Sequence, residues 1–386
     1  GRGAIAHVGD LVERLGSQRV LIVTDQALAS AGIVDRVRGP LAAAGLHVDV
    51  FDGGQPEPAI AVAENAVQFA RDCSPDCIVG LGGGSNMDVA KFTAVALAHG
   101  GSPSDYFGWD NVPGPITSLV CVPTTSGTGS EVSHAAVLTD TANEMKVSCL
   151  SNYTRPALAV VDPELTITCP PQATADSGID ALTHAIEAYT AVDYQDLDLP
   201  AGETGPYDGR TPLGDALAER AVALIAAHLR DVVQQPENIE AREGMALAAT
   251  LAGMSFSNCG VALVHALEYP LGGTLHCSHG AGNGLLLPYV MRYNLPQREA
   301  AIARLAPLLG ADVAGMDQKK AAEAAITAVE QLRADIGIPL RISELGGRED
   351  QLPMFAEKSF AVKRLMKLNP RVPTEADLLG ILREAL

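Results

Sequence analysis

Aromatic side chains are scarce in this chain, since Phe, Trp and Tyr make up 4% of its 386 residues and only one residue is Trp. Small aliphatic residues must therefore fill the core, which favours α/β or helical layers over a β-sandwich. An excess of basic charge is also missing: 27 Lys and Arg stand against 46 Asp and Glu, for a formal net charge of −19. A nucleic-acid partner requires a basic face, and no cluster of Lys and Arg supplies one, so we expect no such partner.

A regular pattern of paired cysteines is missing too. The seven cysteines are an odd number and widely scattered, and the close pair Cys73 and Cys77 has no second pair with which to form a zinc cage. This favours reduced core thiols over a disulfide framework or structural zinc, and it predicts a cytoplasmic location. No signal peptide is recognisable, and because the first residue is Gly1 rather than Met we expect a trimmed chain.

One stretch is long and uncharged enough to resemble a membrane span. Residues 245–267 contain no Asp, Glu, Lys or Arg. They do contain Ser, Thr, Asn and His side chains, which are costly in hydrocarbon. We therefore predict two buried helices with a break near Asn258–Gly260, and no membrane partner.

The chain is longer than the ~250–300 residues at which a single core stops growing, so two domains are expected. In the first half, short apolar runs alternate with helical patterns, which predicts parallel βαβ units. The expected strands are Val20–Thr24, His47–Phe51, Cys77–Leu81, Ser118–Val122 and Ala157–Val161, and the expected helices include Ile60–Asp72 and Met87–His99.

Beyond about residue 170 the pattern changes to Ala-rich helices. The expected helices are Ala173–Tyr189, Gly214–Val233, Ile239–Met254, Gln318–Ile336, Leu352–Leu368 and Glu375–Leu386, the last beginning at a Thr374 cap. The acidic segment Asp193–Arg210 is rich in Gly and Pro, so we expect a surface insertion between two helices. The predicted architecture is an α/β domain with a parallel sheet over residues 1–170 and an all-helical domain over residues 171–386.

A glycine-rich loop, Leu81–Ser85, follows the third expected strand and opens a helix. Glycines let backbone N–H groups approach a pyrophosphate closely, and the helix N-terminus adds a partial positive charge. The loop differs from the GxGxxG fingerprint, so a simple tight turn is the alternative.

A second loop, Pro123–Glu131, is rich in Thr, Ser and Gly and follows the fourth expected strand. Its hydroxyl groups can donate to phosphate or ribose at the carboxyl ends of the strands, where α/β folds bind ligands. Asp25, after the first strand, can accept a bond from the 2′-OH of an adenosine ribose and would repel a 2′-phosphate. This favours NAD over NADP, and the alternative role for Asp25 is a helix N-cap.

A carboxylate and an imidazole, Asp180 and His184, are four residues apart and share one face of an expected helix. Such a pair can bind one metal ion, and an ordinary surface pair is the alternative. With His265 and His279 the set becomes one carboxylate and three imidazoles, which suits Fe(II) or Zn(II) with a position open for substrate. His276 competes with His279, and the spacing does not separate them.

Four motifs make the sequence resemble the iron-containing (group III) alcohol dehydrogenase family over nearly its whole length. They are GGGSNMD at 82–88, PTTSGTGSE at 123–131, GIDALTHAIE at 178–187 and HGAGN at 279–283. The third is highly specific, and together the four make a chance similarity implausible.

The resemblance implies a Rossmann-like N-terminal domain and a helical C-terminal domain, an architecture shared with dehydroquinate synthase, with NAD and metal in the cleft between them. The implied metal ligands are Asp180, His184, His265 and His279, which selects His279 over His276. The implied cofactor-binding residues are Gly83, Gly84, Ser85 and Asp88 on the first loop, Thr124, Thr125 and Thr128 on the second, Asp25 at the ribose and Lys146 near the nicotinamide.

The implied activity is reversible hydride transfer between NAD and a primary alcohol or hydroxy acid as small-molecule substrate. The implied metal is Fe(II), with Zn(II) as the other metal that these ligands suit, and the expected assembly is a homodimer. One departure is Tyr269, where many relatives have histidine; Tyr269 and His276 are the candidate proton relays. Tyrosine here also resembles hydroxyacid–oxoacid transhydrogenases with bound NAD, a first alternative. A sugar-phosphate cyclase of the lyase class is a remote second alternative, because it needs Lys and Arg that residues 176–190 and 260–285 lack.

Overall fold

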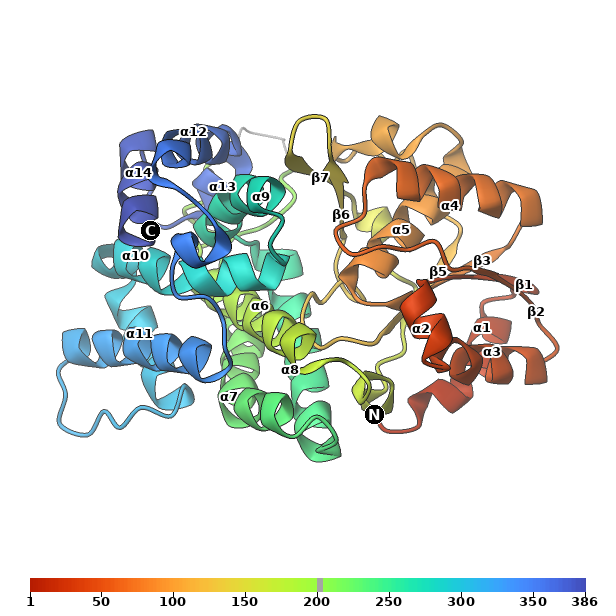
Figure 1. Ribbon diagram of the computed structural model, residues 1–386, viewed down its shortest axis with the longest axis horizontal. Helices are drawn as coiled ribbons and strands as arrows, with labels where there is room; N and C mark the ends of the chain where they lie inside the picture. Colours follow the sequence, from red (N-terminus) through yellow and green to blue (C-terminus); the bar gives the residue numbers. More distant parts are fainter. Residues whose placement is uncertain (200–203) are drawn as a thin grey trace. The chain divides into compact units, whose positions relative to one another are not determined.

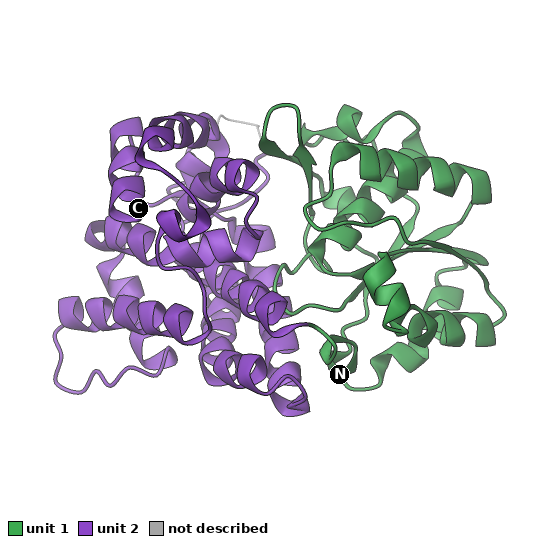
Figure 2. Cartoon of the chain, in the orientation of Figure 1, with its two compact units in different colours: residues 1–169 green, residues 170–386 purple. Residues whose placement is uncertain are grey.

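The computed structural model describes residues 1–199 and 204–386, and the chain divides into two compact units, 1–169 and 170–386 (Figures 1 and 2). The first unit holds a parallel sheet with helices, and the second is helical. The fold class expected from the sequence is therefore confirmed.

The first unit is built on a five-stranded parallel sheet in the order β2-β1-β3-β5-β8. Its strands are β1 Arg19–Val23, β2 His47–Phe51, β3 Cys77–Gly82, β5 Ser118–Pro123 and β8 Leu158–Ala159. Four of them match the expected runs to within one residue at each end, whereas β8 keeps only two residues of the expected five. The central strands β1, β3 and β5 are almost wholly buried, as parallel strands covered on both faces must be.

Helices cover both faces of this sheet. They are α1 Val8–Arg14, α2 Gln26–Ser30, α3 Ile33–Ala43, α4 Ile60–Cys73 and α5 Gly84–His99. Successive residues of β1 point to opposite faces. Val20 and Ile22 join the apolar cluster with α1 and α3, while Leu21 and Val23 join the cluster with α4 and α5. The carboxyl ends of β1, β3 and β5 are thereby held side by side at one edge of the sheet.

A second, three-stranded sheet in the order β4-β7-β6 is not expected from the sequence. Its strands are β4 Gly108–Trp109, β6 Ala135–Asp140 and β7 Met145–Leu150, and the last two form an antiparallel pair. The fully buried Lys91 of α5 donates to the carbonyl oxygens of Ser133 (3.0 Å) and Ala135 (2.7 Å), which attaches this sheet to α5.

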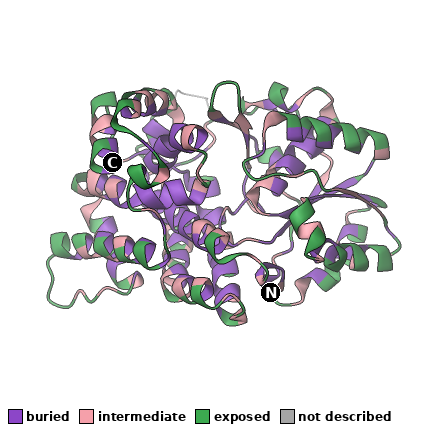
Figure 3. Ribbon diagram, in the orientation of Figure 1, coloured by how far each residue is buried: buried purple, intermediate pink, exposed green. Residues whose placement is uncertain are grey.

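Among the described residues the second unit has no regular strand. Its helices are α6 Pro171–Thr190, α7 Pro212–Gln234, α8 Ile239–Cys259, α9 Leu263–Leu275, α10 His279–Leu308, α11 Gln318–Asp335, α12 Leu352–Ala361, α13 Lys363–Leu368 and α14 Glu375–Glu384. Helix α6 is the core of the unit: every residue from 178 to 190 is buried, against α7, α8, α9 and α10 (Figure 3).

Several boundaries differ from those expected. The single helix expected over residues 352–368 is two helices, because Val362 leaves the helical conformation. The Thr374 cap is present, but its helix ends at Glu384. The expected insertion Asp193–Arg210 lies between α6 and α7 and is closed by a bridge between its first and last residues. Its residues 200–203 lie outside the described part of the chain.

The long uncharged stretch forms two helices, as predicted. Helix α8 ends at Cys259 and α9 begins at Leu263, so the break lies close to the expected position. No single helix in the described ranges is long and apolar enough to cross a membrane. Only α8 and α9 taken together reach that length and composition, and they are bent by 105° at the break.

Candidate active site

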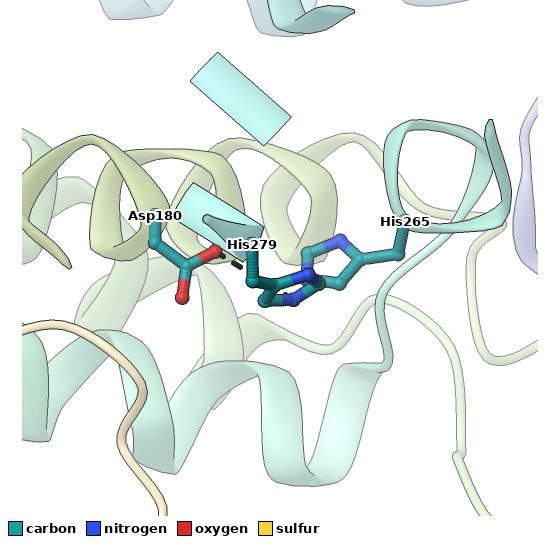
Figure 4. A group of neighbouring side chains, drawn as sticks. All are labelled: Asp180, His265 and His279. Carbon is teal, nitrogen blue, oxygen red and sulfur yellow. Dashed lines mark ion pairs between the residues drawn. The ribbon is translucent and has the colours of Figure 1, made fainter. Parts of the chain in front are cut away.

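Three of the predicted metal ligands lie together in the second unit. Asp180 comes from α6, His265 from α9, and His279 is the first residue of α10. One ligand atom of each lies within 4.8 Å of the other two. Figure 4 shows the carboxylate and the two imidazoles turned toward one another. An oxygen and two nitrogens that converge in this way form a donor set for a divalent metal ion.

The fourth predicted ligand, His184, lies one helical turn beyond Asp180 but is outside this group. Its ring stacks on Phe256 and on His265, at centroid distances of 4.3 and 4.9 Å. Its Nδ1 is 3.9 Å from a carboxylate oxygen of Asp180. The structure thus places His184 beside the three grouped ligands.

Asp180 is buried but is held in its ionised form. Burial by itself would raise the pKa of its carboxyl group, yet the neighbouring imidazoles of His184, His279 and His265 and a hydrogen bond from Asn283 lower that pKa to about 2. An ionised carboxylate is the form that coordinates a metal ion.

Glycines in the HGAGNG sequence that begins α10 bring the ligands together. A Cβ atom at Gly280 would overlap the Asp176 carbonyl oxygen of α6, and one at Gly284 would lie 2.7 Å from the Ile179 side chain of α6. On another side, a Cβ at Gly282 would lie 2.9 Å from Glu268 of α9. Such contacts are shorter than side chains allow. Helix α10 therefore approaches both α6 and α9 only because these positions are glycine.

Three polar residues around the group were not singled out as site residues from the sequence: Glu187, Glu268 and Asn283. The two carboxylates contact the Nδ1 atoms of His265 and His279, each at 2.5 Å. Asn283 donates to Asp180 at 2.8 Å. They follow a predicted ligand on the same helix by seven, three and four residues, spacings that place side chains on one helix face. That spacing marks them as neighbours of the ligands, but it does not show which ligand each of them contacts.

The two candidate proton relays lie in different surroundings. Tyr269 is buried, its ring centroid is 6.4 Å from that of His279, and its hydroxyl oxygen is 3.5 Å from the Arg364 guanidinium. His276 is exposed and ends α9 in the left-handed conformation.

In the first unit, the two glycine-containing loops face each other. Strands β3 and β5 are paired up to Gly82 and Pro123, and the Thr124 amide donates to the Gly82 carbonyl (2.9 Å). A Cβ atom at Gly84 would lie 2.7 Å from the methyl group of Thr128. The first glycine loop therefore opens α5 at the carboxyl edge of the sheet, directly against the hydroxyl-rich loop.

Further predicted residues of the first loop lie on α5 or beside it. Gly83 is the N-cap of α5, a Cβ atom on it would lie 3.5 Å from Thr125, and Ser85 is the second residue of the helix. Asp25 is the N-cap of α2, and its carboxylate accepts hydrogen bonds from the Leu28 amide (2.9 Å) and the Asn86 side chain (2.6 Å). Asp25 is thus a helix cap at the carboxyl end of β1, and Asn86 is a contact that sequence reasoning missed.

Asp88 and Lys146 make contacts within the protein. Asp88 accepts from the Ser130 hydroxyl (2.6 Å) and the Val137 amide (3.0 Å), so it attaches the second loop to α5. Burial raises the pKa of Asp88, and the nearby Lys91 opposes this rise. The ammonium of Lys146, on β7, lies 3.0 Å from a carboxylate oxygen of Glu57.

Comparisons with known proteins agree with this geometry. Residues 1–163 match the iron-containing alcohol dehydrogenase family model, and residues 208–386 match the C-terminal model of the same family. The chain is 38% identical over 386 residues to the NAD-dependent methanol dehydrogenase of Bacillus methanolicus, covering 100% of this chain and 97% of that protein. It is 38% identical over 387 residues to the 1,3-propanediol dehydrogenase of Klebsiella pneumoniae, covering 100% and 96%. A crystal structure of a 1,3-propanediol oxidoreductase matches with a TM-score of 0.93 at 38% identity, covering 100% of this chain and 97% of that one.

The chain therefore belongs to the iron-containing alcohol dehydrogenase family, as its motifs indicated. It is an oxidoreductase that interconverts alcohols and aldehydes. These comparisons favour a dehydrogenase over the transhydrogenase and the cyclase considered above.

Replacing Gly280 with Ala tests whether the close approach of α10 to α6 builds the site. The added methyl group must displace α10, so we expect a loss of stability of about 1–3 kcal/mol and weaker metal binding. Thermal unfolding and metal content of the purified protein measure the two effects. Gly380→Ala is the matched control, because nothing lies within 4 Å of its Cβ position on α14, and we expect it to preserve stability and metal binding. Unchanged metal binding in Gly280→Ala would contradict the packing argument.

Proposed function

We propose that this protein is an Fe(II)- and NAD-dependent alcohol dehydrogenase that interconverts a primary alcohol or hydroxy acid with its aldehyde or oxo acid. The observation that carries the proposal is the convergence of Asp180, His265 and His279 within 4.8 Å in a member of this family. In this proposal residues 1–170 bind NAD and residues 171–386 bind the metal ion and the substrate oxygen.

The donor set fits a divalent metal ion. Asp180 supplies an ionised oxygen, since its pKa is lowered to about 2, and His265 and His279 supply ring nitrogens. We propose His184, whose ring stacks on His265, as the fourth ligand. Such a set suits Fe(II), and Zn(II) is the other metal that it suits. A bound ion of this kind supplies Lewis-acid polarisation of the substrate oxygen, which lowers the pKa of an alcohol.

The loops of the first unit fit a dinucleotide. The start of α5, with Gly83, Gly84 and Ser85, would hold the pyrophosphate by backbone N–H groups and the helix dipole. Two buried hydroxyl groups at the same edge, those of Thr24 and Ser126, have no hydrogen-bond partner among the described residues, so they can donate to a ligand. NAD supplies the hydride acceptor of the reaction.

The remaining predicted contacts complete this cofactor site. Thr124, Thr125 and Thr128 would bind it from the second loop, while Asp88 keeps that loop on α5. Asp25 would accept from the adenosine ribose and repel a 2′-phosphate, which favours NAD over NADP. Lys146 would lie near the nicotinamide. The name of the methanol dehydrogenase relative, which states NAD dependence, supports the choice.

The proton released from an alcohol needs an acceptor. We propose Tyr269 for this role in preference to His276. Its burial and the 6.4 Å distance between its ring and that of His279 place it beside the grouped ligands, whereas His276 is exposed. The Arg364 guanidinium donates to the Tyr269 hydroxyl oxygen at 3.5 Å and fixes its position.

The metal assignment is tested by changing each ligand in turn. Asp180→Ala, His184→Ala, His265→Ala and His279→Ala should each lower kcat/KM by at least about 100-fold, because polarisation of the substrate oxygen is lost. Metal analysis of anaerobically purified protein should show reduced iron, while NAD binding measured by fluorescence stays within about twofold, since the cofactor loops are untouched.

His47→Ala, an exposed histidine of the first unit, is the control for these variants and should keep wild-type rates and iron content. A chelator that removes the metal should abolish the wild-type activity. If His184→Ala keeps the wild-type rate in metal-free buffer, the assigned site is wrong.

The cofactor assignment is tested at the glycine loop. Gly84→Ala places a methyl group against Thr128, so the loop must shift, and NAD should bind at least about tenfold more weakly with metal content unchanged. Asp25→Asn should raise the affinity for NADP relative to NAD. Gly39→Ala, whose Cβ position on α3 has no neighbour within 4 Å, is the control and should bind NAD normally. Wild-type affinity in Gly84→Ala would exclude this loop as the pyrophosphate site.

We also propose that the enzyme acts as a homodimer in the cytoplasm. The scattered, free cysteines, four of them buried, support a reducing compartment. Light scattering of the purified protein should give twice the mass of one chain, and a monomer at micromolar concentration would contradict the dimer.

A further inference from the structure

Two buried carboxylates beside the grouped ligands have no assigned role. Glu187 lies on α6 and Glu268 on α9, and their residues are 4% and 0% exposed. A buried acid is costly unless its oxygens are fully bonded, so its contacts indicate its use. Each contacts Nδ1 of a histidine of the candidate metal centre at 2.5 Å.

Glu187 contacts two successive residues at the start of α9. One oxygen accepts from the backbone amide of Val264 at 2.6 Å, and the other lies 2.5 Å from Nδ1 of His265. A carboxylate oxygen only accepts hydrogen bonds, so Nδ1 of His265 carries the proton. The bond to Val264 fixes the carboxylate itself, and hence the plane and direction of the imidazole that donates to it.

Glu268 orients the imidazole of His279 in the same way. Its oxygen lies 2.5 Å from Nδ1 of His279, across the contact between α9 and α10. This distance depends on Gly282, because a Cβ atom there would lie 2.9 Å from Cγ of Glu268. Each imidazole is therefore oriented by a carboxylate from a different helix.

Asn283 lies where the two imidazoles and the Asp180 carboxylate meet. Its amide nitrogen lies 3.2 Å from Nε2 of His265 and 3.2 Å from Nε2 of His279, and it donates to Asp180 at 2.8 Å. This nitrogen has two hydrogens for three neighbouring atoms, so its contacts show where the two Nε2 atoms converge and do not assign their protons. The two Nε2 atoms consequently converge on the same place as the carboxylate of Asp180.

We propose that Glu187 and Glu268 are positioning residues that hold His265 and His279 as Nδ1–H tautomers with Nε2 aimed at the metal position. The inference rests on the proposed function, since it assumes that these histidines are ligands. Fixing the tautomer and the ring direction before an ion arrives removes part of the cost of assembling the site. Losing either carboxylate is therefore expected to weaken metal binding about 10- to 100-fold.

The first measurement needs no metal. In metal-free wild-type protein labelled with ¹⁵N-histidine, NMR distinguishes a protonated from an unprotonated ring nitrogen. We expect a proton on Nδ1 of both His265 and His279, with the signals assigned by their loss in His265→Ala and His279→Ala. An unprotonated Nδ1 on either residue overturns the proposal for that residue, even if the protein binds metal normally.

The second measurement uses Co(II) as the probe, because its visible absorption reports the ligand geometry. Glu187→Gln and Glu268→Gln should each weaken Co(II) binding, measured by competition with a chelator, and should alter the Co(II) spectrum. Glu330→Gln is the control: this carboxylate pairs with Arg292, so its loss should leave affinity and spectrum unchanged. A purely structural role for Glu187 or Glu268 would lower thermal stability without changing the spectrum of the bound ion.

The two proposals fail differently. If His265→Ala binds Co(II) as well as the wild type does, the ligand assignment is wrong. If His265→Ala loses binding while Glu187→Gln and Glu268→Gln keep wild-type affinity and spectrum, the ligands stand and the positioning role is overturned.

Discussion

The candidate metal centre depends on how closely α10 approaches its neighbours. Gly280 and Gly284 meet α6 and Gly282 meets α9, at distances where a methyl group would overlap backbone or side-chain atoms. A helix that begins with three alternate glycines has poor intrinsic stability. Packing against two other helices compensates for this, and it lets a side chain from each of the three helices reach one position. The short interhelical distance is what turns three separate segments into one site.

Most of the first unit could be predicted because its strands are buried on both faces. The apolar runs that form β1, β3 and β5 are continuous and end at glycine, proline or acidic residues, so pattern alone locates them. The sheet of β4, β6 and β7 could not be predicted in the same way. β4 has two residues, and β6 and β7 are partly exposed. Their pairing depends on each other and on the buried Lys91, which no local pattern reveals.

The site was predictable to the extent that its residues form spaced motifs. Asp180 and His279 followed from the motifs, but Glu187, Glu268 and Asn283 were missed because each acts on a residue of another segment. From the sequence alone, Glu187 cannot be distinguished from the other acidic residues of α6. Its role becomes visible only when Val264 and the following histidine are seen against it. Helix α10 was not predicted because its glycines and three prolines disfavour a helix locally. Tertiary packing overrides that preference.

All the donors of the candidate metal centre, and the side chains that contact them, belong to residues 170–386, and they extend along the chain from Asp180 to Asn283. This has a consequence for biosynthesis. The ribosome releases the first unit before any of these groups, and that unit has clusters of buried residues of its own around which it can form. About a hundred further residues must then emerge before the last donor is available, and joining segments so far apart carries the entropic cost of closing long loops. The metal ion can therefore bind only late in the synthesis of each chain.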